Sequence, residues 1–121
     1  MDEVLEYLSS LPEPQRTTLS RLREDLLAIV PGATEGFSYS MPAVFLKGKA
    51  VAGYFAFKHH LGYFPHSSLV TGQLEAELKG FKVSKGGFQF GHGQFLERSL
   101  VKRLVEVRLE VLAVQYPELF S

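Results

Sequence analysis

The sequence predicts an α+β fold in which an antiparallel β-sheet carries helices on one face. Apolar residues recur at helical spacing towards both ends of the 121-residue chain, whereas the middle alternates aromatic with small or polar residues, as strands do. The connections between these strands are local, so no crossover helix is required and neighbouring strands should run antiparallel. The length suits one domain, and we expect residues 1–121 to form it.

The composition is that of an ordinary globular protein, with 45% hydrophobic and 21% charged residues. Lys and Arg together number 13, as do Asp and Glu, so no net charge favours nucleic acid or an acidic membrane. The absence of cysteine excludes disulfides, thiolate metal sites and cysteine nucleophiles, and it suits a reducing compartment. Without a signal peptide or a long apolar segment, we expect a cytoplasmic monomer or homodimer that binds neither nucleic acid nor membrane.

Two helices are expected first. Val4 and Leu8 have helical spacing, and Asp2 is placed to cap the first turn of a helix that ends near residues 9–12. A longer helix follows and ends at Pro31-Gly32. Its apolar stripe consists of Leu19, Leu22, Leu26, Leu27 and Val30.

The strands should begin after residue 34. Phe37, Tyr39 and Met41 alternate with small or polar residues as one short strand would, and Pro42 places that strand at an edge or a bulge. Three further strands are expected at residues 44–46, 50–58 and 61–64.

The last third should hold a short helix, one more strand and a long helix. Ser67 and Ser68 can cap a helix that reaches Leu78, and Phe88 and Phe90 alternate as a short strand. The closing helix, over residues 95–114, carries an apolar stripe formed by Leu96, Leu100, Leu104, Val107 and Val111.

Strand parity divides the aromatic segment 51–66 between the two faces of the sheet. The apolar set, expected to pack under the helices, is Val51, Phe55 and Phe57. The set expected on the second face is Tyr54, Lys58 and His60, with Tyr39 and Tyr63 beside them. That second face is either an ordinary solvent-exposed surface or a binding site for a small anion or a planar ligand.

Other patterns are weaker indicators of chemistry. Adjacent His59 and His60 would point to opposite faces of a strand, and no H-x-H or H-E-x-x-H pattern is present, so surface histidines are favoured over a metal centre. The segment Ser84-Lys85-Gly86-Gly87 lacks the spacing of a phosphate-binding loop, which favours a structural turn. His60 with Lys58 and Tyr39 could transfer a proton, although no reaction can be named.

Acidic residues surround the first helix, including Glu3, Glu6 and Glu13. Carboxylates on a helix surface can hold hard cations or iron weakly. The alternative is a solvent-exposed helix face whose negative charge stabilises the N-terminus of the helix.

Three segments in order resemble the YdhG-like family of small bacterial domains of unknown function. The matching residues are Tyr39, Met41 and Pro42; Lys58, His60, Gly62, Tyr63 and Pro65 of the segment 54–65; Ser84, Lys85, Gly86 and Phe90; and Arg108 in the closing helix. One member is described as a frataxin-like intracellular iron chaperone. The resemblance therefore implies iron as cargo, with iron–sulfur assembly proteins or ferrochelatase as partners, and Glu3, Glu6 and Glu13 as the nearest candidates to hold the metal.

The sequence thus leads to two hypotheses for a non-enzymatic binding protein. The first is the iron chaperone, with no cofactor other than iron as cargo. The second is a small-molecule or anion-binding domain that uses the aromatic and basic face of the sheet. Its candidate residues are Tyr39, Met41, Pro42, Lys58, His60, Tyr63 and Lys85.

Overall fold

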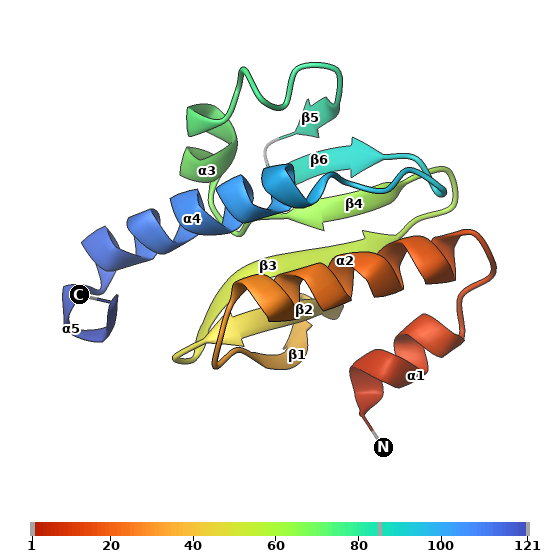
Figure 1. Cartoon of the computed structure of the whole chain (residues 1–121), viewed down its shortest axis with the longest axis horizontal. Coiled ribbons are helices and arrows are strands. Elements are labelled where there is room, and N and C mark those ends of the chain that lie inside the picture. The colour runs from red at the N-terminus through yellow and green to blue at the C-terminus, as the bar shows by residue number, and fades with distance from the viewer. Residues whose placement is uncertain (1, 85, 121) are drawn as a thin grey trace.

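The computed structural model describes residues 2–84 and 86–120. At its centre lies a six-stranded antiparallel sheet with the strand order β1-β2-β3-β4-β6-β5 (Figure 1). The strands are β1 (Thr34–Ser38), β2 (Met41–Leu46), β3 (Lys49–Ala56), β4 (Leu61–Phe64), β5 (Lys82–Ser84) and β6 (Gly87–Phe90). The helices are α1 (Glu3–Ser9), α2 (Gln15–Ile29), α3 (Ser68–Gln73), α4 (Arg98–Gln115) and α5 (Pro117–Phe120).

Helices α2 and α4 lie side by side across one face of the sheet, and α3 lies beside α4 (Figure 1). This arrangement confirms the predicted α+β class with helices on an antiparallel sheet. None of the helices in the described part of the chain combines the length and the apolarity that crossing a membrane requires.

The N-terminal helices form for the predicted local reasons. The Val4 N–H donates to Asp2 Oδ1 at 2.8 Å, which caps α1. The stripe of α2 is buried at Leu19, Leu22 and Leu26. On another side of α2, the Arg23 guanidinium donates to both carboxylate oxygens of Glu35 at 2.6 and 2.8 Å, which ties the helix to β1.

The predicted strand through Phe37, Tyr39 and Met41 is wrong, because the chain turns within it. Tyr39 and Ser40 both have positive φ, 52° and 63°, and form the two-residue turn between β1 and β2. Turns of this kind match the twist of a hairpin but are usually signalled by Gly or Asn, and neither stands here. Strand β5 and helix α5 were not predicted, and α3 ends before Leu78.

The predicted assignment of the sheet faces is also wrong. Tyr54, Tyr63 and Phe88 lie opposite one another on β3, β4 and β6, and they are 1%, 0% and 2% exposed in the core beneath the helices. The cause is a bulge: the pairing of β3 with β2 passes from Ala52 to Ala50 and skips Val51. A bulge reverses the alternation of side chains, so Val51 and Tyr54 are both buried although their parity differs.

On the sheet face opposite α2 and α4, which we call the open face, five of six neighbouring residues in one row are glycine, alanine or serine, and the sixth is Phe64. From one edge of the sheet to the other, this row consists of Gly36, Ala43, Gly53, Phe64, Gly87 and Ser84. Aromatic rings lie over the glycines: a Cβ added to Gly36 would be 3.3 Å from the Phe45 ring. We call these six residues the small-residue row.

We predict that Gly87→Ala is strongly destabilising. The added Cβ would overlap the backbone carbonyl oxygen of Tyr63, which cannot rotate away as a side chain could. The free energy of unfolding, measured with urea, should fall by at least about 2 kcal/mol.

Gly72→Ala in α3 is the matched control, because an added Cβ there has no neighbour within 4 Å. It should raise the free energy of unfolding by about 0.5–1 kcal/mol, since alanine favours a helix over glycine. Equal effects of the two substitutions would show that the close contact at Gly87 is not important.

Candidate functional site

A hollow of about 400 Å³ lies on the open face, where β1 turns into β2 and β4 ends. It brings together residues from the β1–β2 hairpin, the segment between β4 and α3, and the β5–β6 turn. The lining residues are Tyr39, Met41, Phe64, His66, Ser67, Ser68 and Gly86. We call it the open-face hollow.

His66 is held in a fixed position over the small-residue row. Its backbone has a positive φ of 62°, which is uncommon for a residue with a side chain. A Cβ added to Gly53 would stand 3.0 Å from His66 Cε1, so the imidazole uses the space that this glycine leaves. Its Nε2 lies 3.2 Å from Ser38 Oγ, whereas Nδ1 is buried and makes no hydrogen bond within the described residues.

The surroundings of His66 favour its neutral form. Burial lowers the pKa of the imidazole, the positive charge of Arg108 lowers it further, and the nearby backbone of Phe64 opposes both effects. We therefore describe His66 as an uncharged imidazole at neutral pH.

Tyr39 forms the outer wall of the open-face hollow. Its side chain is 86% exposed, although it is a large aromatic residue. The Tyr39 ring is nearly parallel to the His66 ring, with an interplanar angle of 22° and a centroid distance of 6.4 Å. A two-residue turn therefore holds one ring over another at the mouth of the hollow.

The structure brings only some of the predicted ligand-binding residues to this hollow. Tyr39 and Met41 line it, and Pro42 is buried in the adjoining strand. Tyr63, expected on the open face, instead lies in the core under the helices. Lys85 lies outside the described residues.

Lys58 and His60 lie at the tip of the β3–β4 hairpin, away from the hollow. His60 precedes β4 and His66 follows it, so these two histidines do not converge. At the tip, the His60 ring stacks on Phe57 with a centroid distance of 4.9 Å. His92 Nε2 lies 3.0 Å from the carbonyl oxygen of Phe57, and this contact holds the loop between β6 and α4 against the same tip.

Sequence reasoning did not identify Phe64, His66, Ser67 and Ser68 as site residues. The available signal was the position of His66 directly after the Gly62–Pro65 part of the family motif. Its contact with Ser38, which is 28 residues away in the chain, requires the three-dimensional fold.

The described residues contain no group of three or more His, Asp or Glu side chains placed to hold a metal ion. The Glu13 carboxylate accepts hydrogen bonds from the Thr17 N–H at 3.0 Å, the Thr17 hydroxyl at 2.8 Å and Arg16 Nε at 3.2 Å. The Thr17 hydroxyl is the largest cause that lowers the pKa of Glu13, followed by the Thr17 backbone. Glu3 and Glu6 are exposed in the first turn of α1, where negative charge stabilises the helix.

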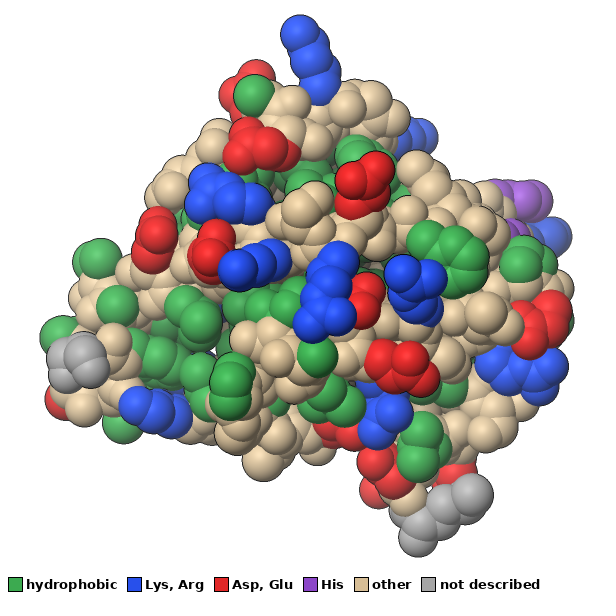
Figure 2. All heavy atoms as spheres, in the orientation of Figure 1, with side chains coloured by type: hydrophobic (Ala, Val, Ile, Leu, Met, Phe, Trp, Pro, Cys, Tyr) green, Lys and Arg blue, Asp and Glu red, His purple; other side chains and the backbone are tan. Residues whose placement is uncertain are grey.

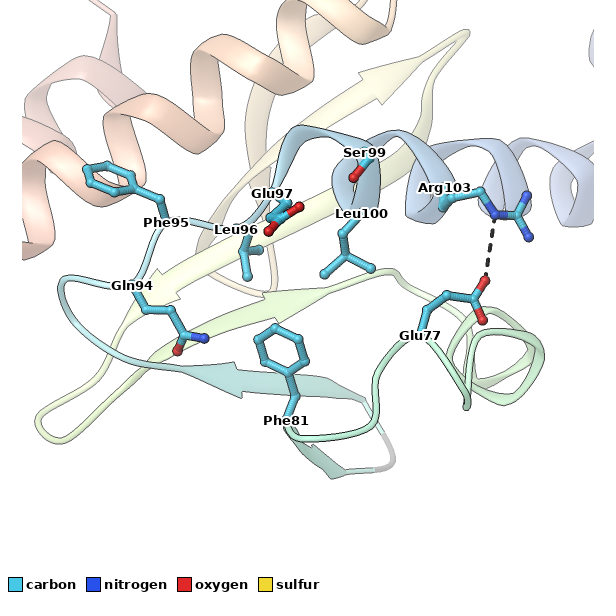
Figure 3. A pocket seen from close by; sticks show the side chains of 9 residues that line it. All are labelled: Glu77, Phe81, Gln94, Phe95, Leu96, Glu97, Ser99, Leu100 and Arg103. Carbon is cyan, nitrogen blue, oxygen red and sulfur yellow. Dashed lines mark ion pairs between the residues drawn. The ribbon is translucent and has the colours of Figure 1, made fainter.

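A second hollow, of about 460 Å³, lies on the helix side beside the start of α4 (Figure 3). Phe81 and Leu100 point into it, and Arg103 forms an ion pair with Glu77 at 3.7 Å at one end. Arg103 also lies 3.6 Å from Glu106. Basic and acidic side chains are interspersed over this whole face (Figure 2).

This helix-side hollow is the larger one, but it is the weaker candidate. The opposite charges at its rim already neutralise one another, and no residue of the family-like segments lines it. The open-face hollow has such residues on three of its sides, so we consider it the candidate functional site.

The sheet order and the helices on one face define an α+β domain whose fold is shared with a solved structure. One such structure is the crystal structure of YdhG from Bacillus subtilis, a protein of the DUF1801 family. It is similar to this chain with a TM-score of 0.80 and 16% sequence identity, and the alignment covers 89% of each chain. No family model and no curated protein matches the sequence.

At this level of identity the comparison shows the fold. It confirms the fold that the resemblance to the YdhG-like family implied, and the name DUF1801 denotes a domain of unknown function. The function therefore has to be argued from the site.

We predict that protonation of His66 destabilises the folded chain. Its pKa in the folded state lies below the value of about 6.5 expected for the unfolded chain. As the pH falls, the unfolded chain therefore binds a proton at His66 before the folded chain does. The contribution of neutral His66 to the free energy of unfolding is complete above about pH 6.5 and is lost as the pH falls from there through the lower folded-state pKa. Urea denaturation should give a lower free energy of unfolding at pH 5 than at pH 7.5.

The variant His66→Asn should lose most of this pH dependence, because asparagine tolerates positive φ and does not titrate in this range. His60→Gln is the control, since the pKa of His60 is also lowered, mainly by burial, but its side chain stands near solvent at the hairpin tip. An unchanged pH dependence in His66→Asn would contradict the prediction.

Proposed function

We propose that the chain is a small-molecule-binding protein and that the open-face hollow is its ligand site. One observation carries this proposal: residues from three separate family-like segments meet at the same hollow. Tyr39 and Met41 come from the first segment, Phe64 from the second and Gly86 from the third. A common ligand site is a physical reason for such different segments to meet.

The dimensions and chemistry of the hollow support this proposal. Ligand sites typically measure about 300–1,000 Å³ and combine apolar walls with a few polar groups. Met41 and Phe64 provide apolar walls, and His66 with the hydroxyl groups of Ser67 and Ser68 provides polar atoms.

The pair formed by Ser38 and His66 also has to be considered as a nucleophile and a base. In a hydrolase of that kind, an acidic group orients the imidazole through its other nitrogen. His66 Nδ1 makes no such hydrogen bond within the described residues. We therefore propose binding rather than hydrolysis.

The iron-chaperone function implied by the family resemblance is the alternative proposal. It would use Glu3, Glu6 and Glu13 with iron as cargo. These residues are less organised than the hollow, because Glu13 is engaged with Thr17 and Arg16, and Glu3 and Glu6 are exposed on α1.

A screen of small organic molecules should identify compounds that bind at the open-face hollow. Met41 lines this hollow and is one of two methionines in the chain, so selective methyl labelling gives an NMR signal that reports on the site. We expect binders to shift the Met41 methyl signal and to raise the thermal midpoint of unfolding, since ligands that bind only the folded state stabilise it.

Ser68→Tyr should reduce the affinity of these compounds at least about tenfold by filling the hollow, which corresponds to about 1.4 kcal/mol. Ser99→Tyr, at the helix-side hollow, is the matched control and should leave binding unchanged. Compounds whose binding is lost only in Ser99→Tyr would show that we have proposed the wrong hollow.

Ferrous iron distinguishes the two proposed functions. If the open-face hollow carries the function, anaerobic calorimetry with Fe²⁺ should give the same weak signal for the parent chain and for the double variant Glu3→Gln, Glu6→Gln. Glu110→Gln on α4 is the control for a lost surface charge. Uptake in the micromolar range that disappears only in the double variant would favour the iron chaperone.

A further inference from the structure

We infer that the ligand of the open-face hollow is a planar heteroaromatic ring that inserts between the rings of Tyr39 and His66. This inference rests on the proposed function and specifies the class of ligand.

The geometry of the two rings is the first argument. Their planes are within 22° of parallel and their centroids are 6.4 Å apart. Nonbonded carbon atoms in contact are about 3.5 Å apart, so a ring in contact with two others needs about 7 Å between them. Tyr39, which is exposed in the two-residue turn, would have to move outward to open this spacing.

The exposure of Tyr39 is the second argument. A ring pressed directly against His66 would lose much of its accessible surface, yet Tyr39 keeps 86% of its surface exposed. Both residues line the same hollow. An aromatic side chain fixed in a turn and left uncovered is suited to stacking on a flat ligand.

The remaining walls define the ligand further. The thioether of Met41 and the ring of Phe64 can contact the edge of an inserted ring, and sulfur is favoured at such an edge. The hydroxyl groups of Ser67 and Ser68 can bond to polar ring atoms.

His66 contributes as a neutral partner. Its Nε2 is fixed by Ser38, and the packing against Gly53 prevents the ring from sinking towards the sheet. The imidazole therefore provides a rigid platform, while Tyr39 provides the movable side of the stack. An aliphatic ligand of similar size would contact Met41 and Phe64 but would gain little from Tyr39.

The test compares two neutral probes, adenosine as a planar heteroaromatic compound and cis-1,2-cyclohexanediol as a non-planar one. Titrations followed at the Met41 methyl signal measure both affinities. We expect adenosine to bind, to shift this signal through its ring current, and to bind much more tightly than the diol.

Tyr39→Asn removes the ring and retains a residue that tolerates positive φ, so the turn should still form. It should weaken the binding of adenosine about tenfold or more, as the loss of a stacking side chain does elsewhere, whereas Tyr39→Phe should retain binding. Phe95→Ala removes another exposed ring, in the helix-side hollow, and should have no effect. Thermal unfolding of each variant verifies that it is folded.

The outcomes separate the two proposals. If adenosine and the diol bind equally, or if Tyr39→Asn binds adenosine as the parent does, the stacking inference is wrong and the hollow is still a ligand site. If neither probe nor any compound of the screen moves the Met41 signal, the proposed function and the inference are both wrong.

Discussion

On the open face, aromatic rings pack closely against glycine residues, which have no side chain. Glycine in a strand costs stability, because it loses more conformational freedom on folding than other residues. At Gly36 and Gly53 this cost is offset by the ring that occupies the vacated space, that of Phe45 in one case and that of His66 in the other. Gly53 thus leaves room for the ring of His66, which in turn lines the open-face hollow.

The two faces of the sheet serve different purposes. Under the helices, the stacked rings of Tyr63 and Phe88 (centroid distance 5.3 Å) fill the core, with the Tyr63 hydroxyl buried and without a hydrogen bond in the described part of the chain. The open face has partly covered rings and a hollow. The bulge at Val51 makes this division possible, because it allows Val51 and Tyr54 to be buried on the same side. A dense face stabilises the fold, which leaves the other face available for a ligand.

Sequence reasoning predicted the features that depend on local spacing. The cap at Asp2, the stripe of α2 and the α+β class all follow from residues close together in the chain. The faces of the sheet could not be predicted, because they depend on the pairing register of β2 and β3, which no single strand reveals. The turn at Tyr39 and Ser40 was missed because neither residue is usual at positive φ. Tyr39 and Met41 were nevertheless identified as candidates, whereas His66 depends on long-range contacts with Ser38 and Gly53.

Arg108, the family-like residue of the closing helix, links α4 to the sheet near this region. It is only 8% exposed, and its Nε–H donates to the carbonyl oxygen of Ala50 at 3.0 Å, beyond the end of the β3–β4 pairing. The hydrogen bond holds α4 against the start of β3, and burial lowers the pKa of the guanidinium without removing its charge. That charge is one of the causes that keep His66 neutral. Residues from all three family-like segments thus line the open-face hollow, and Arg108 of the closing helix acts on His66 through its charge.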